Sequence, residues 1–240
     1  MDHRAERIDL AAAFRWFARL DMHESVANHL SLAVSGSKFL INPRGRHFSR
    51  ICASDLLLLD ATDKATLERP DAPDPTAWYL HARLHERVPE ARCVMHLHSK
   101  YATALACLQD STLYPIDMNT MRSFGRVALD RDFSGMALSD DEGERVARLL
   151  HKGRSVLLMA NHGALVIGPS VAHAFDEFYY FERAAETQLT CYATGKPLRI
   201  VADEIAALTE RQWRGYGQLA LDHFANVKAI LDAEDSSYRH

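Results

Sequence analysis

Few cysteines, no long apolar run and no apolar leader are the main absences in this sequence. The four cysteines are too scattered for C-x-x-C zinc pairs or a redox motif. No stretch approaches the roughly 18 apolar residues that a membrane-spanning helix needs. The chain starts with MDHRAERIDL, which is charged and has no apolar core of a secretory signal. These absences predict a cytoplasmic protein with reduced thiols and no membrane partner.

An excess of basic charge is also missing. The formal net charge is −4 at pH 7, so the sequence has no basic footprint and we expect no nucleic-acid partner. The apolar content of 48% and the charged content of 25% are ordinary for a soluble globular protein. A chain of 240 residues is long enough to bury a sizeable core and is near the upper end for one domain.

The order of apolar patterns predicts one α/β domain over residues 1–240. Apolar runs predict strands over residues 29–36, 37–43, 54–60, 93–98, 155–160 and 164–168. Helical spacing or cap signals predict helices over residues 8–25, 77–88, 100–108, 140–152 and 171–194. A helical tail follows from about residue 201, and residues 109–138 have few periodic signals. We expect a three-layer α/β/α domain with a largely antiparallel central sheet.

Local signals place several of the expected boundaries. Thr76 and Ser99 can each cap the helix that follows. Ser139 and Glu142 have the spacing of a capping box, which opens a helix that Gly153 can end. Gly163 can take a positive φ in the tight turn between the last two strands.

Histidine is abundant, with thirteen residues, and two of them form an H-x-H pair. His96 and His98 lie at the end of the strand CVMHLH, so their side chains share one face of the sheet and can chelate one ion. His162, in the turn ANHGALVIG, is the third candidate ligand. Three histidines that leave one position open are the ligand set of a catalytic zinc rather than a structural one. Taken alone, the H-x-H pattern is explained equally well by two half-buried histidines that make ordinary polar contacts.

Other histidines have less specific spacing. His81 and His85 are four residues apart on the expected helix, but the zincin pattern needs Glu where this chain has Ala82. We interpret the pair as helix surface or as residues around a metal site. His29 precedes a strand, and we expect a structural role near the site.

Four stretches together resemble the class II aldolase/adducin family over about residues 8–200. They are NHLSLAV, FLINPRGRHFSRICASDLLLLD, MHLHSKYATAL and LMANHGALVIG, in the order of the family. The resemblance implies a single α/β/α domain, often assembled as a tetramer with active sites at subunit interfaces. Trp213 and Tyr216 could then reach a neighbour's site, or pack within their own helices.

The resemblance also implies a ligand set. The three zinc-binding histidines of the sugar-phosphate aldolases match His96, His98 and His162. We therefore expect one divalent metal ion per subunit, with zinc as the first choice and manganese or iron as alternatives, since the ligand set alone does not select the metal.

The sequence departs from the aldolases at two places. Ala77 occupies the position of their catalytic Glu, which leaves Asp74, Asp117 or a residue of a neighbouring subunit as candidate proton donors. The phosphate-binding stretch carries Arg44 beside Gly45, and arginine suits a carboxylate. We expect Asn28, Arg44 and Gly45 to bind substrate, although a solvated loop charge is an equal alternative for Arg44.

These features predict a metal-dependent lyase that cleaves a carbon–carbon bond of a small oxo- or hydroxy-carboxylate without phosphate. Decarboxylation needs an electron sink and a proton donor, whereas retro-aldol cleavage also needs the base that Ala77 replaces. One alternative is a non-catalytic, adducin-like interaction domain, although adducins lack the metal histidines. The other is a sugar-phosphate aldolase or epimerase with a substitute acid/base.

Overall fold

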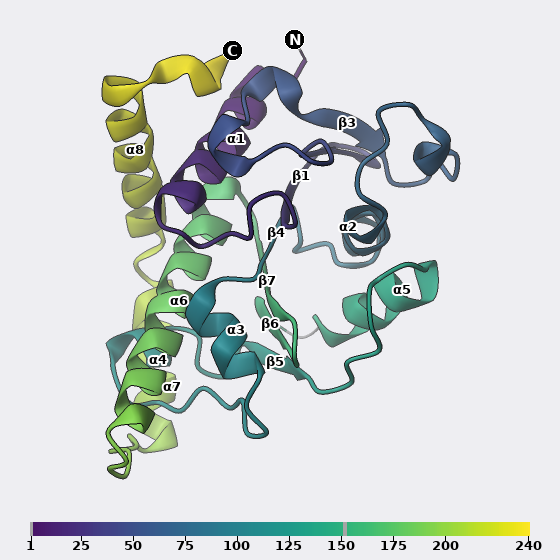
Figure 1. Cartoon of the computed structure of the whole chain (residues 1–240). Coiled ribbons are helices and arrows are strands. Elements are labelled where there is room, and N and C mark those ends of the chain that lie inside the picture. The colour runs from purple at the N-terminus through teal and green to yellow at the C-terminus, as the bar shows by residue number, and fades with distance from the viewer. Residues whose placement is uncertain (1, 151–152) are drawn as a thin grey trace.

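A seven-stranded sheet forms the centre of the computed structural model, which describes residues 2–150 and 153–240 (Figure 1). In chain order the strands are β1 (His29–Ser35), β2 (Lys38–Ile41), β3 (Leu57–Asp60), β4 (Cys93–Leu97), β5 (Val127–Asp130), β6 (Val156–Met159) and β7 (Gly163–Gly168). Their spatial order is β3-β2-β1-β4-β7-β6-β5, and every neighbouring pair is antiparallel except β5 and β6.

Helices cover both faces of this sheet (Figure 1). One face packs against α1 (Arg4–Arg19), α3 (Lys100–Ala106) and α6 (Val171–Ala193), and α8 (Gly217–Glu234) packs against α6 and α1. The other face packs against α2 (Pro75–Arg87) and α5 (Asp140–Leu149). Two further helices, α4 (Met118–Arg122) and α7 (Asp203–Arg214), pack against each other, and α4 also packs against α6. No helix in the two described stretches is both long and apolar enough to cross a membrane.

Alternation along the central strands builds the two apolar cores. Cys93 and Met95 of β4 face the layer that contains α6, whereas Val94 between them faces α2 and α5. The same alternation holds along β6 and β7, since successive side chains of a strand point to opposite faces. The three-layer α/β/α class with a largely antiparallel sheet is therefore confirmed. His96 follows this alternation and lies on the α2 side of β4.

The segment 109–138 contains more regular structure than the sequence predicted. It holds α4, of five residues, and β5, of four residues. Elements this short complete too few periods to produce a helical or strand pattern. β5 also adds the one parallel pair to the sheet, through its register with β6.

One predicted helix cap differs from the structure and another agrees with it. Asp74, not Thr76, caps α2, because its carboxylate accepts a hydrogen bond from the Thr76 backbone N–H at 3.0 Å. The Ser139 hydroxyl accepts a hydrogen bond from the Glu142 backbone N–H at 3.3 Å. This is one of the two hydrogen bonds that the capping-box spacing predicts. The predicted end of that helix includes residues 151–152, which lie outside the described residues.

Two further local predictions are corrected by tertiary contacts. Ser99 lies at the start of α3, but its hydroxyl donates to Glu182 of α6 at 2.6 Å instead of capping the helix. The Glu182 carboxylate accepts from two backbone N–H groups of the first turn of α3 and so performs the capping. In the turn between β6 and β7 the positive φ belongs to Asn161, at 56°, and not to Gly163.

Candidate metal centre

Three histidines meet at the end of β4. His96 lies in β4, His98 follows the strand, and His162 lies in the turn between β6 and β7. The pairing of β4 with β7 brings this turn beside the end of β4. Gly163 is needed for that approach, because a Cβ atom there would lie 2.7 Å from the carbonyl oxygen of Leu97. Sheet order and one glycine therefore position the third histidine.

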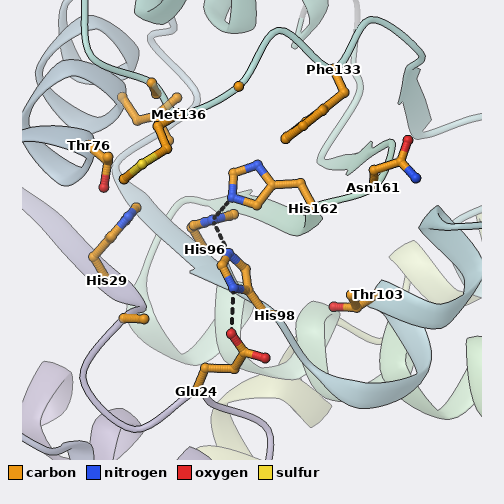
Figure 2. A pocket seen from close by; sticks show the side chains of 14 residues that line it. Glu24, His29, Thr76, His96, His98, Thr103, Phe133, Met136, Asn161 and His162 are labelled. Atoms are coloured by element: carbon orange, nitrogen blue, oxygen red, sulfur yellow. Dashed lines mark hydrogen bonds and ion pairs between the residues drawn. The ribbon is translucent and has the colours of Figure 1, made fainter.

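The three imidazoles converge on one point (Figure 2). The Nε2 atom of His96 lies 3.1 Å from Nε2 of His98 and 3.3 Å from Nε2 of His162. A tetrahedral zinc ion with Zn–N bonds of about 2.0–2.1 Å separates two ligand nitrogens by about 3.3 Å. The spacing of the three side chains therefore fits a divalent ion of this size.

The protonation pattern of the histidines also fits a cation. The Nδ1–H group of His96 donates to the carbonyl of Ala164 at 3.1 Å, and that of His98 donates to the Glu24 carboxylate at 3.0 Å. Each neutral ring then carries no hydrogen on Nε2, the atom that points to the centre. Burial lowers the pKa of His96 well below its ordinary value and that of His162 to about 4. Neutral imidazole is the form that binds metal.

A cavity of about 370 Å³ opens in front of the three histidines. Its polar lining includes Glu24, His29, Thr76 and Asn161, and its apolar lining includes Leu80, Phe133, Met136 and Ala137. Figure 2 shows the histidine rings at the centre, with Phe133 and Met136 above them and Glu24 below. A mostly apolar pocket with a few polar groups is typical of a small-molecule site.

The carboxylate in this cavity is one that the sequence did not single out. Ala77 is buried in an apolar cluster with Phe39, so its position supplies no acid or base to the cavity. Among the described residues, neither Asp74 nor Asp117 lines the cavity, and their carboxylates cap α2 and α4. Glu24 lies on the cavity wall, in the loop between α1 and β1, where sequence periodicity gives no signal.

The candidate substrate-binding residues lie in two places. Arg44 and Gly45 line a separate concavity, and the Arg44 side chain is 68% exposed with its Nε 3.6 Å from Asp74. Asn28 is buried, and its Oδ1 atom accepts from the backbone N–H of Glu24 at 2.8 Å. Asn28 thus holds the loop that carries Glu24, while the described fold keeps Arg44 and Gly45 outside the histidine cavity.

The structure places His81 and His85 behind the candidate site rather than on the helix surface, which is the second of the two alternatives that the sequence left open. His81 is fully buried, and its Nε2 atom lies 2.7 Å from Nδ1 of His29. The His29 ring in turn lies 4.9 Å from the His96 ring, measured between centroids. Both helix histidines therefore lie behind the candidate ligands. The antiparallel register of β1 and β4, which sets His29 opposite His96, is the long-range feature that the sequence pattern did not contain.

The tail aromatics occupy different environments. The Trp213 ring lies over the Arg122 guanidinium of the same chain, at 4.7 Å, and 6.2 Å from the Tyr216 ring. Tyr216 is 62% exposed. Trp213 thus packs within its own chain, while Tyr216 remains on the surface.

Comparison with known proteins agrees with this geometry. Residues 8–189 match the family model of the class II aldolase and adducin N-terminal domain. The chain is 31% identical over 229 residues to the decarboxylase NovR of Streptomyces niveus, covering 91% of this chain and 84% of that protein. A crystal structure of an aldolase II superfamily protein from Pseudomonas syringae is 29% identical, with a TM-score of 0.88 over 99% of this chain and 96% of that one.

A second solved structure shares the fold at lower identity. The L-fuculose 1-phosphate aldolase of Glaciozyma antarctica is 23% identical, with a TM-score of 0.83 over 100% of this chain and 93% of that one. Class II aldolases typically depend on a divalent metal, and the histidine triad is present here. The chain belongs to the class II aldolase and adducin family.

Proposed function

We propose that this protein is a metal-dependent lyase that cleaves a carbon–carbon bond of a small oxo- or hydroxy-carboxylate without phosphate. The observation that carries the proposal is the convergence of the Nε2 atoms of three histidines at the wall of one cavity. A relative at 31% identity that is named a decarboxylase supports this reaction class.

We assign His96, His98 and His162 as ligands of one divalent ion per subunit, with zinc as the first choice and manganese or iron as alternatives. When bound, such an ion supplies a Lewis acid that stabilises the negative charge left when the carbon–carbon bond breaks. The Glu24 carboxylate orients His98, and the Ala164 carbonyl orients His96.

Decarboxylation suits the proton-transfer groups of the cavity better than retro-aldol cleavage does. Ala77 leaves the usual position of the base without a carboxylate, and decarboxylation needs no base to remove a hydroxyl proton. A proton donor is still required. Glu24 is a stronger candidate than Asp74 or Asp117, because it lies on the cavity wall and its Oε1 atom can carry the proton while Oε2 accepts from His98.

Arg44 remains a candidate for binding a substrate carboxylate from outside the cavity. Among the described residues its exposed guanidinium pairs with Asp74 at 3.6 Å, and rotation of this side chain would allow a bidentate contact with a carboxylate. Gly45 has a φ of 73°, which allows the tight turn that presents Arg44. Asn28 holds the loop that carries Glu24. Asn28 then acts through Glu24 and His98 rather than on substrate.

We further propose that the protein is a cytoplasmic homotetramer with active sites near subunit interfaces, because members of the family often assemble in this way. Exposed apolar side chains on the α4 and α7 side of the molecule, including Met118 and Tyr216, are candidates for such an interface. Light scattering at micromolar concentration tests this assembly, and a monomeric mass would contradict it.

Two alternatives remain distinct from the proposal. The first is a non-catalytic interaction domain, since the family includes the adducin N-terminal domain. A sugar-phosphate aldolase or epimerase would share the fold of the L-fuculose 1-phosphate aldolase but would need an acid/base other than residue 77. The two alternatives predict different metal contents and different substrates.

One set of measurements separates these functions. Metal analysis of the purified protein should give one divalent ion per subunit, and His98→Ala should lower it sharply, with His173→Ala as a control outside the triad. The protein should turn over a member of a panel of 3-oxo and hydroxy-aromatic acids, and His98→Ala should not. A protein without metal affinity would favour the interaction domain. Efficient turnover of fuculose or ribulose phosphates would favour the aldolase.

A further inference from the structure

A chain of hydrogen bonds runs from the cavity into the core behind the candidate metal ligands. The Nδ1 atom of His29 lies 2.7 Å from Nε2 of His81, and Nδ1 of His81 contacts the hydroxyl of Ser31. The same hydroxyl lies 2.7 Å from Nε2 of His85. The chain ends where Nδ1 of His85 meets the carbonyl oxygen of Ala91 at 2.9 Å. Within residues 2–150 and 153–240, Nε2 of His29 is the ring nitrogen of this series that has no hydrogen-bond partner, and His29 lines the cavity.

The hydrogen-bond partners of the three histidines are one another, a serine hydroxyl and a carbonyl oxygen, with no carboxylate of the described residues among them. A protonated ring would therefore be a buried charge without a counterion, so all three rings are neutral. Burial lowers the pKa of His81 well below the ordinary value. Burial also lowers the pKa of His85, to about 4. Each ring therefore carries one hydrogen, on one of its two nitrogens, and the other nitrogen is an acceptor.

The carbonyl at the end of the chain fixes the direction of every bond. A carbonyl only accepts, so the hydrogen of His85 is on Nδ1 and its Nε2 is bare. That bare nitrogen accepts the single hydrogen of Ser31. Ser31 must then accept from Nδ1–H of His81, whose bare Nε2 accepts from Nδ1–H of His29. It follows that Nε2 of His29 carries no hydrogen.

Thr76 presents a second acceptor to the same cavity. Its hydroxyl donates to the Asp74 carboxylate at 2.6 Å, so only oxygen lone pairs remain for other contacts. His29 and Thr76 both line the cavity, and Figure 2 shows their side chains on the side where Met136 also lies. We call Nε2 of His29 and Oγ1 of Thr76 the acceptor wall.

We propose that the acceptor wall binds a hydroxyl group of the substrate by accepting its hydrogen bond. A carboxylate or carbonyl oxygen is disfavoured at this position, since it would set lone pairs against lone pairs. A ligand that lacks the donor would leave a buried acceptor unpaired, which is the basis on which polar sites reject such analogues. The choice of a hydroxy acid as ligand rests on the proposed function, whereas the direction of the hydrogen bonds does not.

The direction of the bonds is tested by NMR on the metal-free full-length protein labelled with ¹⁵N-histidine. The nitrogen shifts should show His29, His81 and His85 with hydrogen on Nδ1 and bare Nε2. Ser31→Ala removes the link between His81 and His85, so the His29 tautomer should become mixed. Ser123→Ala, at a buried serine outside the chain, should keep the wild-type pattern. A hydrogen on Nε2 of wild-type His29, or an unchanged His29 pattern in Ser31→Ala, would overturn the proposal.

The ligand is tested by titrating the zinc-loaded protein with 3-hydroxybutyrate and with 3-methoxybutyrate, which keeps the oxygen but cannot donate. The hydroxy acid should bind about tenfold more tightly, the value of one hydrogen bond. The ratio should fall towards one in His29→Phe. Equal affinities in the wild type, an unchanged ratio in His29→Phe, or binding of neither acid at millimolar concentration would overturn the ligand assignment. A protein that discriminates the two acids but cleaves no substrate would refute the lyase function alone.

Discussion

Glu24 and His98 form a carboxylate–imidazole pair at the mouth of the cavity, with Oε2 of Glu24 3.0 Å from Nδ1 of His98 (Figure 2). The pair joins a loop residue to a candidate metal ligand that lies 74 positions later in the chain. Because the carboxylate takes the hydrogen of Nδ1, the ring is held with its bare Nε2 towards the other two histidines.

This pair predicts the effect of Glu24→Gln on metal binding. A neutral amide orients the imidazole less strongly and lowers the basicity of the ligand nitrogen. Removing a hydrogen-bond partner of a metal ligand commonly lowers metal affinity 10- to 100-fold. Because Glu24 is exposed, we expect a loss at the lower end, about tenfold. Competition with a chromophoric zinc chelator measures it. Glu90→Gln, at an exposed loop residue outside the cavity, should leave the affinity unchanged. Equal affinity of wild type and Glu24→Gln would contradict the assigned role.

Gly163→Ala should weaken both the fold and the metal site. The added Cβ would meet the Leu97 carbonyl at 2.7 Å and the His98 ring at 2.9 Å, so β4 and the turn must separate. Overpacking of this kind costs about 1–3 kcal/mol, and the separation should also move His162 away from His96. Urea denaturation and zinc titration measure the two effects. Gly217→Ala, where nothing lies within 4 Å of the new Cβ, is the matched control and should be neutral or slightly stabilising.

The sequence predicted the parts of the fold that depend on local periodicity. Strand alternation placed His96 and His98 on one face, and the apolar runs identified six of the seven strands of the described sheet. β5 and α4 were not predicted, because four or five residues show no clear period.

The predicted site was incomplete for a different reason. The chain from His29 to His85 depends on the packing of α2 against β1, which joins residues 52 positions apart in the pair His29 and His81. Glu24 reaches the cavity because Asn28 holds its loop, and no spacing rule describes such a contact. The spacing of His81 and His85 left the helix surface and the surroundings of the metal site as alternatives, and only the packing of α2 places His81 in the core.

Introducing the family's carboxylate by Ala77→Glu should destabilise the protein rather than restore aldol cleavage. Ala77 is 2% exposed and packs with Phe39 and Trp78, so a glutamate there would bury an unpaired charge. That situation costs about 3–5 kcal/mol. Burial raises the pKa of such a carboxyl, so the loss should shrink as the pH falls towards about 5 and the group protonates. Ala77→Ser controls for polarity without charge. Wild-type stability with new turnover of fuculose phosphate would contradict this expectation.

The stability of the metal-free protein should depend on His85 between pH 4 and pH 6.5. The folded pKa of His85 is lowered from 6.5 to about 4 because the ring is desolvated, so the unfolded chain binds more protons in this range. The contribution of His85 is therefore complete above pH 6.5 and is lost as the pH falls towards 4. A shift of this size corresponds to at most about 3 kcal/mol. Urea unfolding at several pH values measures the free energy of unfolding of wild type and of His85→Gln. Subtracting one from the other removes the contribution of the carboxylates, which both proteins share. His240→Gln, at the exposed chain end, should keep the wild-type slope, and a His85→Gln slope equal to wild type would show that this ring is already protonated in the folded state.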